Sequence, residues 1–277
     1  MYIEPDLALP FFALRFPLLR SFTSGTWDEG ITSFPGFHDF ILAHSETLED
    51  LAMEYSSRQE VNPTALVFGS DDSLPPTCLP NLRVFKGHCR NVESMARAKL
   101  QCSRSLADLT IGVGRIENPR AEIERMLDEI GSGRLRKCLG GLKELDFDFF
   151  ASADEERDWI PLFIRRWGEI CGSSLEVWHG FLPFVWSWGP DELADFFSSF
   201  AKLQVIWLAH DSRCFGVFPA DSNPERVSPE VIASYVRSLA QRCPALEEVW
   251  LLIWGYETSC WKVERRQGSP LSVRCAD

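Results

Sequence analysis

The chain has 277 residues, of which 45% are hydrophobic, 12% aromatic and 25% charged, a composition that excludes a wholly disordered protein. It carries 28 Lys and Arg residues against 40 Asp and Glu residues, which gives a net charge of −12. Because nucleic acids and anionic membranes are bound through basic surfaces, this balance argues against both as partners.

The cysteines and the N-terminal segment predict the compartment. The nine cysteines are scattered without a Cys-x-x-Cys pair, so we expect reduced thiols, no structural zinc and no other cofactor. Residues 1–18 form a lead-in that carries acids before its apolar stretch, which is a poor signal peptide. No apolar run approaches the roughly 18 residues of a membrane helix. We therefore expect a cytoplasmic or nuclear protein.

A short unit of the form apolar-x-x-apolar-x-apolar, or a near version of it, recurs along the chain. Its first leucines are 29, 34, 24, 36, 33, 28 and 43 residues apart, an average of about 32 that is close to the period of a strand-plus-helix repeat. Each unit predicts one short strand. In chain order the units are 19–22, 48–53, 82–85, 106–111, 142–147, 175–178, 203–208 and 246–251.

Segments with helical periodicity lie between these units. In 119–130 the apolar residues fall on one face, and in 228–239 Ser228 and Pro229 are start signals. The predicted helices are 37–43, 92–100, 119–130, 154–170, 191–200 and 228–239. This alternation predicts an α/β solenoid with a parallel sheet of about eight short strands and helices on its opposite face.

The period of a strand assigns the residues of each unit to two faces. Positions four and six of the unit point to the core, whereas positions three and five point to the other side of the sheet. We expect one domain over 1–277, in which repeats fill 19–255 and residues 256–277 form a capping segment. Such a segment covers core that the last repeat would otherwise expose.

The Leu-x-x-Leu-x-Leu cores at 48–53, 106–111, 142–147, 203–208 and 246–251 resemble those of leucine-rich repeat proteins. The resemblance covers roughly residues 16–255. The uneven repeats and phrases such as Leu79-Pro-Asn-Leu-Arg resemble ribonuclease-inhibitor-like arrays attached to fungal F-box proteins. The family's asparagine, eight residues after the first leucine, is replaced throughout, and an F-box is not evident in residues 1–18.

What the resemblance implies is a non-enzymatic protein-recognition module, the substrate-binding part of an F-box-type ubiquitin-ligase receptor. An array of this kind binds its partner on the exposed face of the sheet. An orphan repeat array without a dedicated ligand is a further alternative.

Tryptophan is the most unevenly distributed residue, because nine of the ten lie between 159 and 261. Trp178 occupies a core position, and Trp159 and Trp167 lie on a helical apolar stripe, so we expect these three to pack. Trp207 and Trp250 both occupy position five of neighbouring units, which predicts two indoles side by side on the sheet face. Large exposed aromatic side chains are typical of protein-binding hot spots. Burial under a loop or the capping segment is the alternative.

Acidic side chains are expected on the same face, towards the middle of the array. Glu144, Asp146 and Asp148 are two residues apart and should point to one side of a strand. Asp108 belongs to an earlier repeat unit, and His179 stands at position five of its own unit. We predict that this acidic zone and the aromatic zone bind a basic protein with an apolar anchor. Alternatively, the carboxylates at 144, 146 and 148 could bind a divalent cation and serve a metal-dependent enzyme.

Overall fold

The structure, a computed structural model, is α/β, as predicted. It describes residues 11–24, 36–53, 77–97, 105–112, 119–132, 135–148, 159–181, 188–210, 228–253, 258–265 and 271–276. Within these residues, ten strands follow one another in chain order, and most of their pairings are parallel. The count exceeds the predicted eight or so because the capping segment itself contributes two strands.

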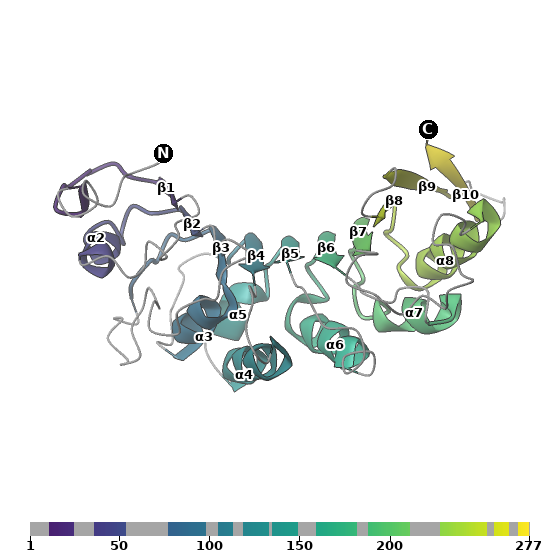
Figure 1. Cartoon of the computed structure of the whole chain (residues 1–277), viewed down its shortest axis with the longest axis horizontal. Helices are drawn as coiled ribbons and strands as arrows, with labels where there is room; N and C mark the ends of the chain where they lie inside the picture. The colour runs from purple at the N-terminus through teal and green to yellow at the C-terminus, as the bar shows by residue number, and fades with distance from the viewer. Residues whose placement is uncertain are drawn as a thin grey trace, which may run out of the picture. The chain divides into compact units, whose positions relative to one another are not determined.

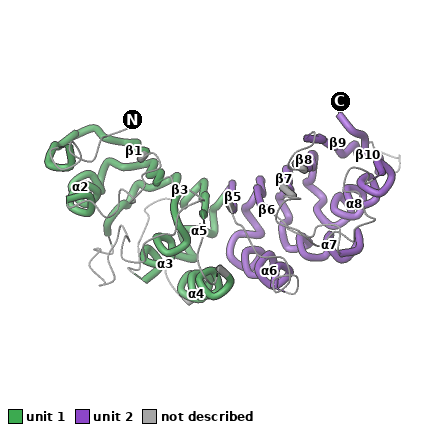
Figure 2. The backbone as a smooth tube through the Cα atoms, viewed as in Figure 1, with its two compact units in different colours: residues 1–142 green, residues 143–277 purple. Residues whose placement is uncertain are grey.

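The chain divides into two compact units, residues 1–142 and 143–277, which are coloured separately in Figure 2. In the first unit strands β1 to β4 pair in parallel, and helices α3, α4 and α5 lie on one side of β3 and β4 (Figure 1). The elements are β1 (Ser21–Ser24), α2 (Phe37–Ala43), β2 (Asp50–Met53), β3 (Val84–His88), α3 (Cys89–Arg97), β4 (Asp108–Gly112), α4 (Pro119–Ser132) and α5 (Leu135–Leu139).

In the second unit strands β5 to β8 are parallel, β9 pairs antiparallel with β8, and β10 pairs antiparallel with β9. Helices α6, α7 and α8 follow successive strands of this unit (Figure 1). The elements are β5 (Glu144–Asp148), α6 (Trp159–Cys171), β6 (Val177–Phe181), α7 (Pro190–Phe196), β7 (Val205–His210), α8 (Pro229–Arg242), β8 (Glu248–Ile253), β9 (Ser259–Glu264) and β10 (Ser272–Ala276).

One hydrogen-bond pattern recurs at the start of the strands. The carbonyl oxygen at position two of a unit accepts bonds from two successive N–H groups of the next strand. In the first compact unit, for example, the carbonyl oxygen of Arg20 accepts from the N–H groups of Glu49 and Asp50. In the second compact unit, that of Lys143 accepts from the N–H groups of Glu176 and Val177. The same double acceptance is made by the carbonyls of Glu49, Arg83, Glu176 and Gln204. It fixes the register of the parallel strand pairs within each compact unit.

The helices cover the face that carries positions four and six, where the core lies. Trp178 is fully buried and its ring meets Phe197 of the segment after α7 edge-on, with centroids 5.4 Å apart. Trp159 and Trp167 are also buried, which confirms all three predicted packing residues. The first leucines of the units from 48 onward are at most 1% exposed: Leu48, Leu82, Leu106, Leu142, Leu175, Leu203 and Leu246.

In two strands, glycine replaces the apolar residue that the repeat pattern has at position six. The packing of the core explains this replacement. In β3 a Cβ added to Gly87 would lie 2.8 Å from the ring of Phe85, and in β6 one added to Gly180 would lie 2.5 Å from Nε1 of Trp178. In both strands position four is a large aromatic residue. Its ring occupies the space that a position-six side chain fills elsewhere, so the two positions share one volume.

Helix boundaries differ from the predicted ones in identifiable ways. α8 begins as predicted, with the Ser228 hydroxyl accepting a bond from the N–H of Val231 at 3.4 Å. α3 begins at Cys89 rather than 92, directly after β3, and the last three residues expected for it lie outside the described residues. α7 ends at Phe196 rather than 200, because the next N–H groups bond three residues back and the chain turns.

Helices α3 and α4 are joined by Arg–Glu pairs, and each helix supplies an arginine to a glutamate of the other. Arg90 makes two bonds of 2.9 Å to Glu122, and Arg125 of α4 donates to Glu93 of α3 at 2.7 Å. The side chain of Glu93 is only 6% exposed and also pairs with Arg97 of its own helix, so two arginines offset the burial of this carboxylate. The sequence analysis did not identify this network.

The segment that contains β9 and β10 is attached to the second unit by strand pairing and also by the side chain of Arg265. Arg265, just after β9, donates to the carbonyl oxygens of Ala240 and Cys243 at 2.9 and 3.1 Å, and also to that of Leu246. These carbonyls lie at and just beyond the end of α8, where backbone acceptors lack helical partners and a cation is favoured.

The shared volume at positions four and six predicts a compensating pair of substitutions in β3. Gly87→Ala alone should lower the free energy of unfolding by about 1–3 kcal/mol through overpacking. Added to Phe85→Leu, the same substitution should cost little or stabilise, because the smaller side chain vacates the space. Urea unfolding of the wild type, both single variants and the double variant measures the coupling, and additive effects would contradict the explanation.

Candidate partner-binding site

Parallel pairing in register brings four predicted site residues into one row on the sheet face of the second unit. Asp146 of β5 stands opposite His179 of β6, His179 opposite Trp207 of β7, and Trp207 opposite Trp250 of β8. Equivalent positions on adjacent strands point to the same side of a sheet. The side-by-side placement of Trp207 and Trp250 predicted from position five is therefore present.

The three rings of this row stack on one another; His179, Trp207 and Trp250 are hereafter the aromatic row. The two indoles are nearly parallel, at 1°, with centroids 4.4 Å apart, and His179 stacks on Trp207 at 9° and 5.3 Å. Strand spacing sets these distances, since neighbouring strands lie about 4.8 Å apart. Stacking turns the ring faces towards one another, which leaves ring edges for contact with a partner.

All three rings are half-buried, so neither full exposure nor complete burial holds for Trp207 and Trp250. The side chain of His179 is 31% exposed. Val177 and Val205, at position three of their units, are half-buried beside the row on the same face. The centre of this face is thus apolar and in part open.

Acidic side chains lie at the β5 end of the row. The Glu144 carboxylate is 43% exposed, and its Oε1 lies 3.5 Å from Nε2 of His179. Asp146 is half-buried in the row itself. Asp148 is the last residue of β5, and the structure describes its backbone but not its side chain.

The predicted metal alternative gains no site from the described part of the chain. Among those residues, no group of three or more His, Cys, Asp and Glu side chains is arranged to hold a metal ion. The structure does not describe the side chain of Asp148, the third carboxylate of that hypothesis. The metal-dependent enzyme therefore stays a prediction.

Asp108, the remaining predicted site residue, lies in the other compact unit. It is half-buried on β4, opposite Val84 of β3, on a face that also carries Thr110 and Lys86. The site described here is accordingly defined by the residues of the second unit.

At the β8 end, the aromatic row is fixed by a carboxylate that the sequence analysis missed. The Trp250 indole donates from Nε1 to Glu248 at 3.0 Å, and Nζ of Lys262 on β9 lies 3.3 Å from the same carboxylate. The indole bond, followed by Lys262, lowers the pKa of Glu248 from its usual 4.5. Glu248 stands at position three of its unit, which already placed it on this face. Lys262 could not be found, because its antiparallel strand was not predicted.

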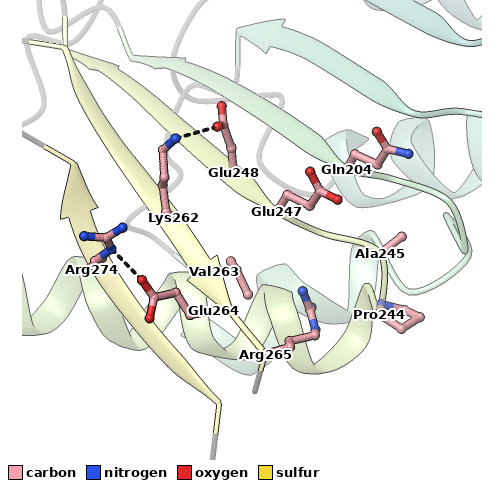
Figure 3. Close-up of a pocket in the computed structure, with 10 residues that line it drawn as sticks. All are labelled: Gln204, Pro244, Ala245, Glu247, Glu248, Lys262, Val263, Glu264, Arg265 and Arg274. Atoms are coloured by element: carbon pink, nitrogen blue, oxygen red, sulfur yellow. Dashed lines mark ion pairs between the residues drawn. The ribbon is translucent and has the colours of Figure 1, made fainter. Parts of the chain in front are cut away.

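Beside this carboxylate, a polar hollow of about 510 Å³ lies where β8, β9 and β10 run side by side (Figure 3). Its cations are paired within the protein: Lys262 with Glu248, and Arg274 with Glu264 at 2.7 Å. Arg265, also in the lining, bonds to the carbonyls after α8. The three cations that line the hollow are therefore already engaged by acceptors of the protein.

The buried cysteines Cys89 and Cys171 of the described core have thiols that are not activated for reaction. Burial raises the pKa of the Cys89 and Cys171 thiols to about 12, so both are protonated near neutral pH. The Cys171 thiol donates to the carbonyl of Trp167 at 3.3 Å, as a packed helical residue does. Neither thiol is poised as a nucleophile.

The comparisons with known proteins leave the class of this chain open. No family model matches it, and no match is found among curated proteins. Within the described residues, no helix has both the length and the apolar character needed to cross a membrane.

The lowered pKa of Glu248 predicts how the sheet face responds to acid. A carboxyl group with a lowered folded-state pKa stabilises the fold above its unfolded value, and that contribution is lost as pH falls through the folded pKa. The wild type should thus be more stable than Glu248→Gln at pH 6–7, and the difference should vanish in acid.

Urea unfolding between about pH 3 and pH 7 measures this difference. Trp250→Phe, which retains a ring but removes the indole donor, should weaken the pH dependence. Equal pH dependence in wild type and Glu248→Gln would contradict the role assigned to the carboxylate.

Proposed function

We propose that the protein is a non-enzymatic recognition module that binds a protein partner on the sheet face of its second unit. The observation that carries the proposal is the aromatic row, three stacked and half-buried rings beside two half-buried valines. Aromatic side chains dominate the energetics of protein interfaces, because they bury much area with few rotatable bonds. Rings that are already ordered by stacking lose little further freedom on binding.

We further propose that the architecture is a leucine-rich-repeat solenoid. Three features support it: strands that pair in chain order, first leucines buried at equivalent places, and position-two carbonyls that bond in the same way to successive strands. Each repeat has too little core to be stable alone and is completed by its neighbours. In such a solenoid the sheet face is free of helices and available to a partner.

The resemblance to F-box receptors suggests the process that the module serves. Under this proposal the bound protein is a substrate of a ubiquitin ligase, and the chain is the substrate-binding part of the receptor, in the cytoplasm or nucleus. Co-purification of ubiquitin-ligase components with the wild-type chain would support this step. Their absence from those eluates would contradict it.

The test of the recognition site is a pair of matched double variants. Trp207→Ala/Trp250→Ala removes two rings of the aromatic row, whereas Leu162→Ala/Val231→Ala trims two exposed apolar side chains on helices α6 and α8. Quantitative affinity purification from the cells that make the protein should show at least one partner reduced about tenfold or more by the first variant alone.

Both variants must first be shown to be folded by circular dichroism and thermal unfolding. The proposal is wrong if the Trp variant retains every partner at wild-type levels. It is equally wrong if the helix-side variant loses the same partners, because that would indicate a general loss of stability.

A further inference from the structure

The sheet face of the second unit changes character from strand to strand. On β5 it presents Glu144 and Asp146, hereafter the acidic pair. On β6 and β7 it presents valine, histidine and tryptophan, with no lysine or arginine among the side chains that the structure describes there. The charge of this face is therefore concentrated at one end of the apolar centre.

The opposite end of the face is neutralised within the protein. Glu248 is held by Lys262 and by the Trp250 indole, and Glu264 is held by Arg274 on the next strand. A cationic group of a partner would gain less there, because each carboxylate already has a protein cation. The two ends of the apolar centre thus differ in charge: Lys262 and Arg274 balance the carboxylates on β8 and β9, whereas the side chain beside Glu144 is His179.

His179 connects the acidic pair to the apolar centre. Its Nε2 faces Glu144 at 3.5 Å while its ring stacks on Trp207. A partner that reaches the acidic pair therefore lies beside the aromatic row as well. Because β5 and β7 are two strand intervals apart, the acidic pair and Trp207 are separated by about 10 Å across the strands.

We propose that this face binds a protein segment that places a lysine or arginine on the acidic pair and an apolar side chain against Val205 and Trp207, roughly 10 Å away. The inference rests on the proposed function and adds the chemistry and orientation of the partner. The apolar side chain supplies most of the affinity by burying the ring edges and the valine. The cation fixes the direction in which the segment lies and speeds the encounter.

The test uses the full chain and a displayed library of random twelve-residue peptides as the probe. Peptides selected on the wild type should be enriched in lysine or arginine paired with a large apolar residue. Glu144→Gln/Asp146→Asn should weaken their binding about tenfold, and Trp207→Ala/Trp250→Ala should weaken it at least as much. The control, Glu169→Gln/Glu230→Gln, makes the same change of charge at exposed positions on α6 and α8 and should leave binding unchanged.

Each other outcome separates this inference from the proposed function. If the Trp variant loses the peptides but the acidic-pair variant binds them normally, or if no basic residue is enriched, the inference is overturned and the recognition face stands. If the Trp variant binds the selected peptides as the wild type does, both fail. If the control weakens binding as much as the acidic-pair variant, the effect is one of net charge and the inference fails.

Discussion

In-register parallel pairing of successive strands is the constraint on which the rest of the structure depends. For the parallel pairs within each compact unit it is fixed where the strand begins, by a position-two carbonyl that accepts two N–H bonds from its neighbour. Once the register is set, residues at the same position of successive units stand side by side. One set of rows then forms the core against the helices, and the other forms the sheet face.

The same constraint accounts for both kinds of aromatic residue. At position four, Trp178 and Phe85 point into the core and take the volume of position six, where glycine follows two residues later. At position five, Trp207 and Trp250 point outward and stack at the spacing of the strands. A stacked pair contributes about 0.5–1.5 kcal/mol beyond its area burial, so the aromatic row also stabilises the face that displays it.

The period of two along a strand made the α/β class, the core leucines and the side-by-side tryptophans predictable from the sequence. The same logic placed His179 and the acidic pair on the sheet face. Features that depend on contacts between distant segments were not predictable. The Glu248–Lys262 pair requires the antiparallel return of β9, the role of Arg265 requires the end of α8, and the Arg–Glu network requires the packing of α3 against α4.

The most direct test of the central claim is site-specific photo-crosslinking in the cells that make the protein. A photoreactive amino acid would replace Val205, beside the aromatic row, and in a separate variant Leu162, which is 53% exposed on α6. The account predicts a light-dependent adduct with a defined protein from position 205, formed through a segment that carries a lysine or arginine, and none from position 162. No adduct at 205, or the same adduct at both positions, would contradict it.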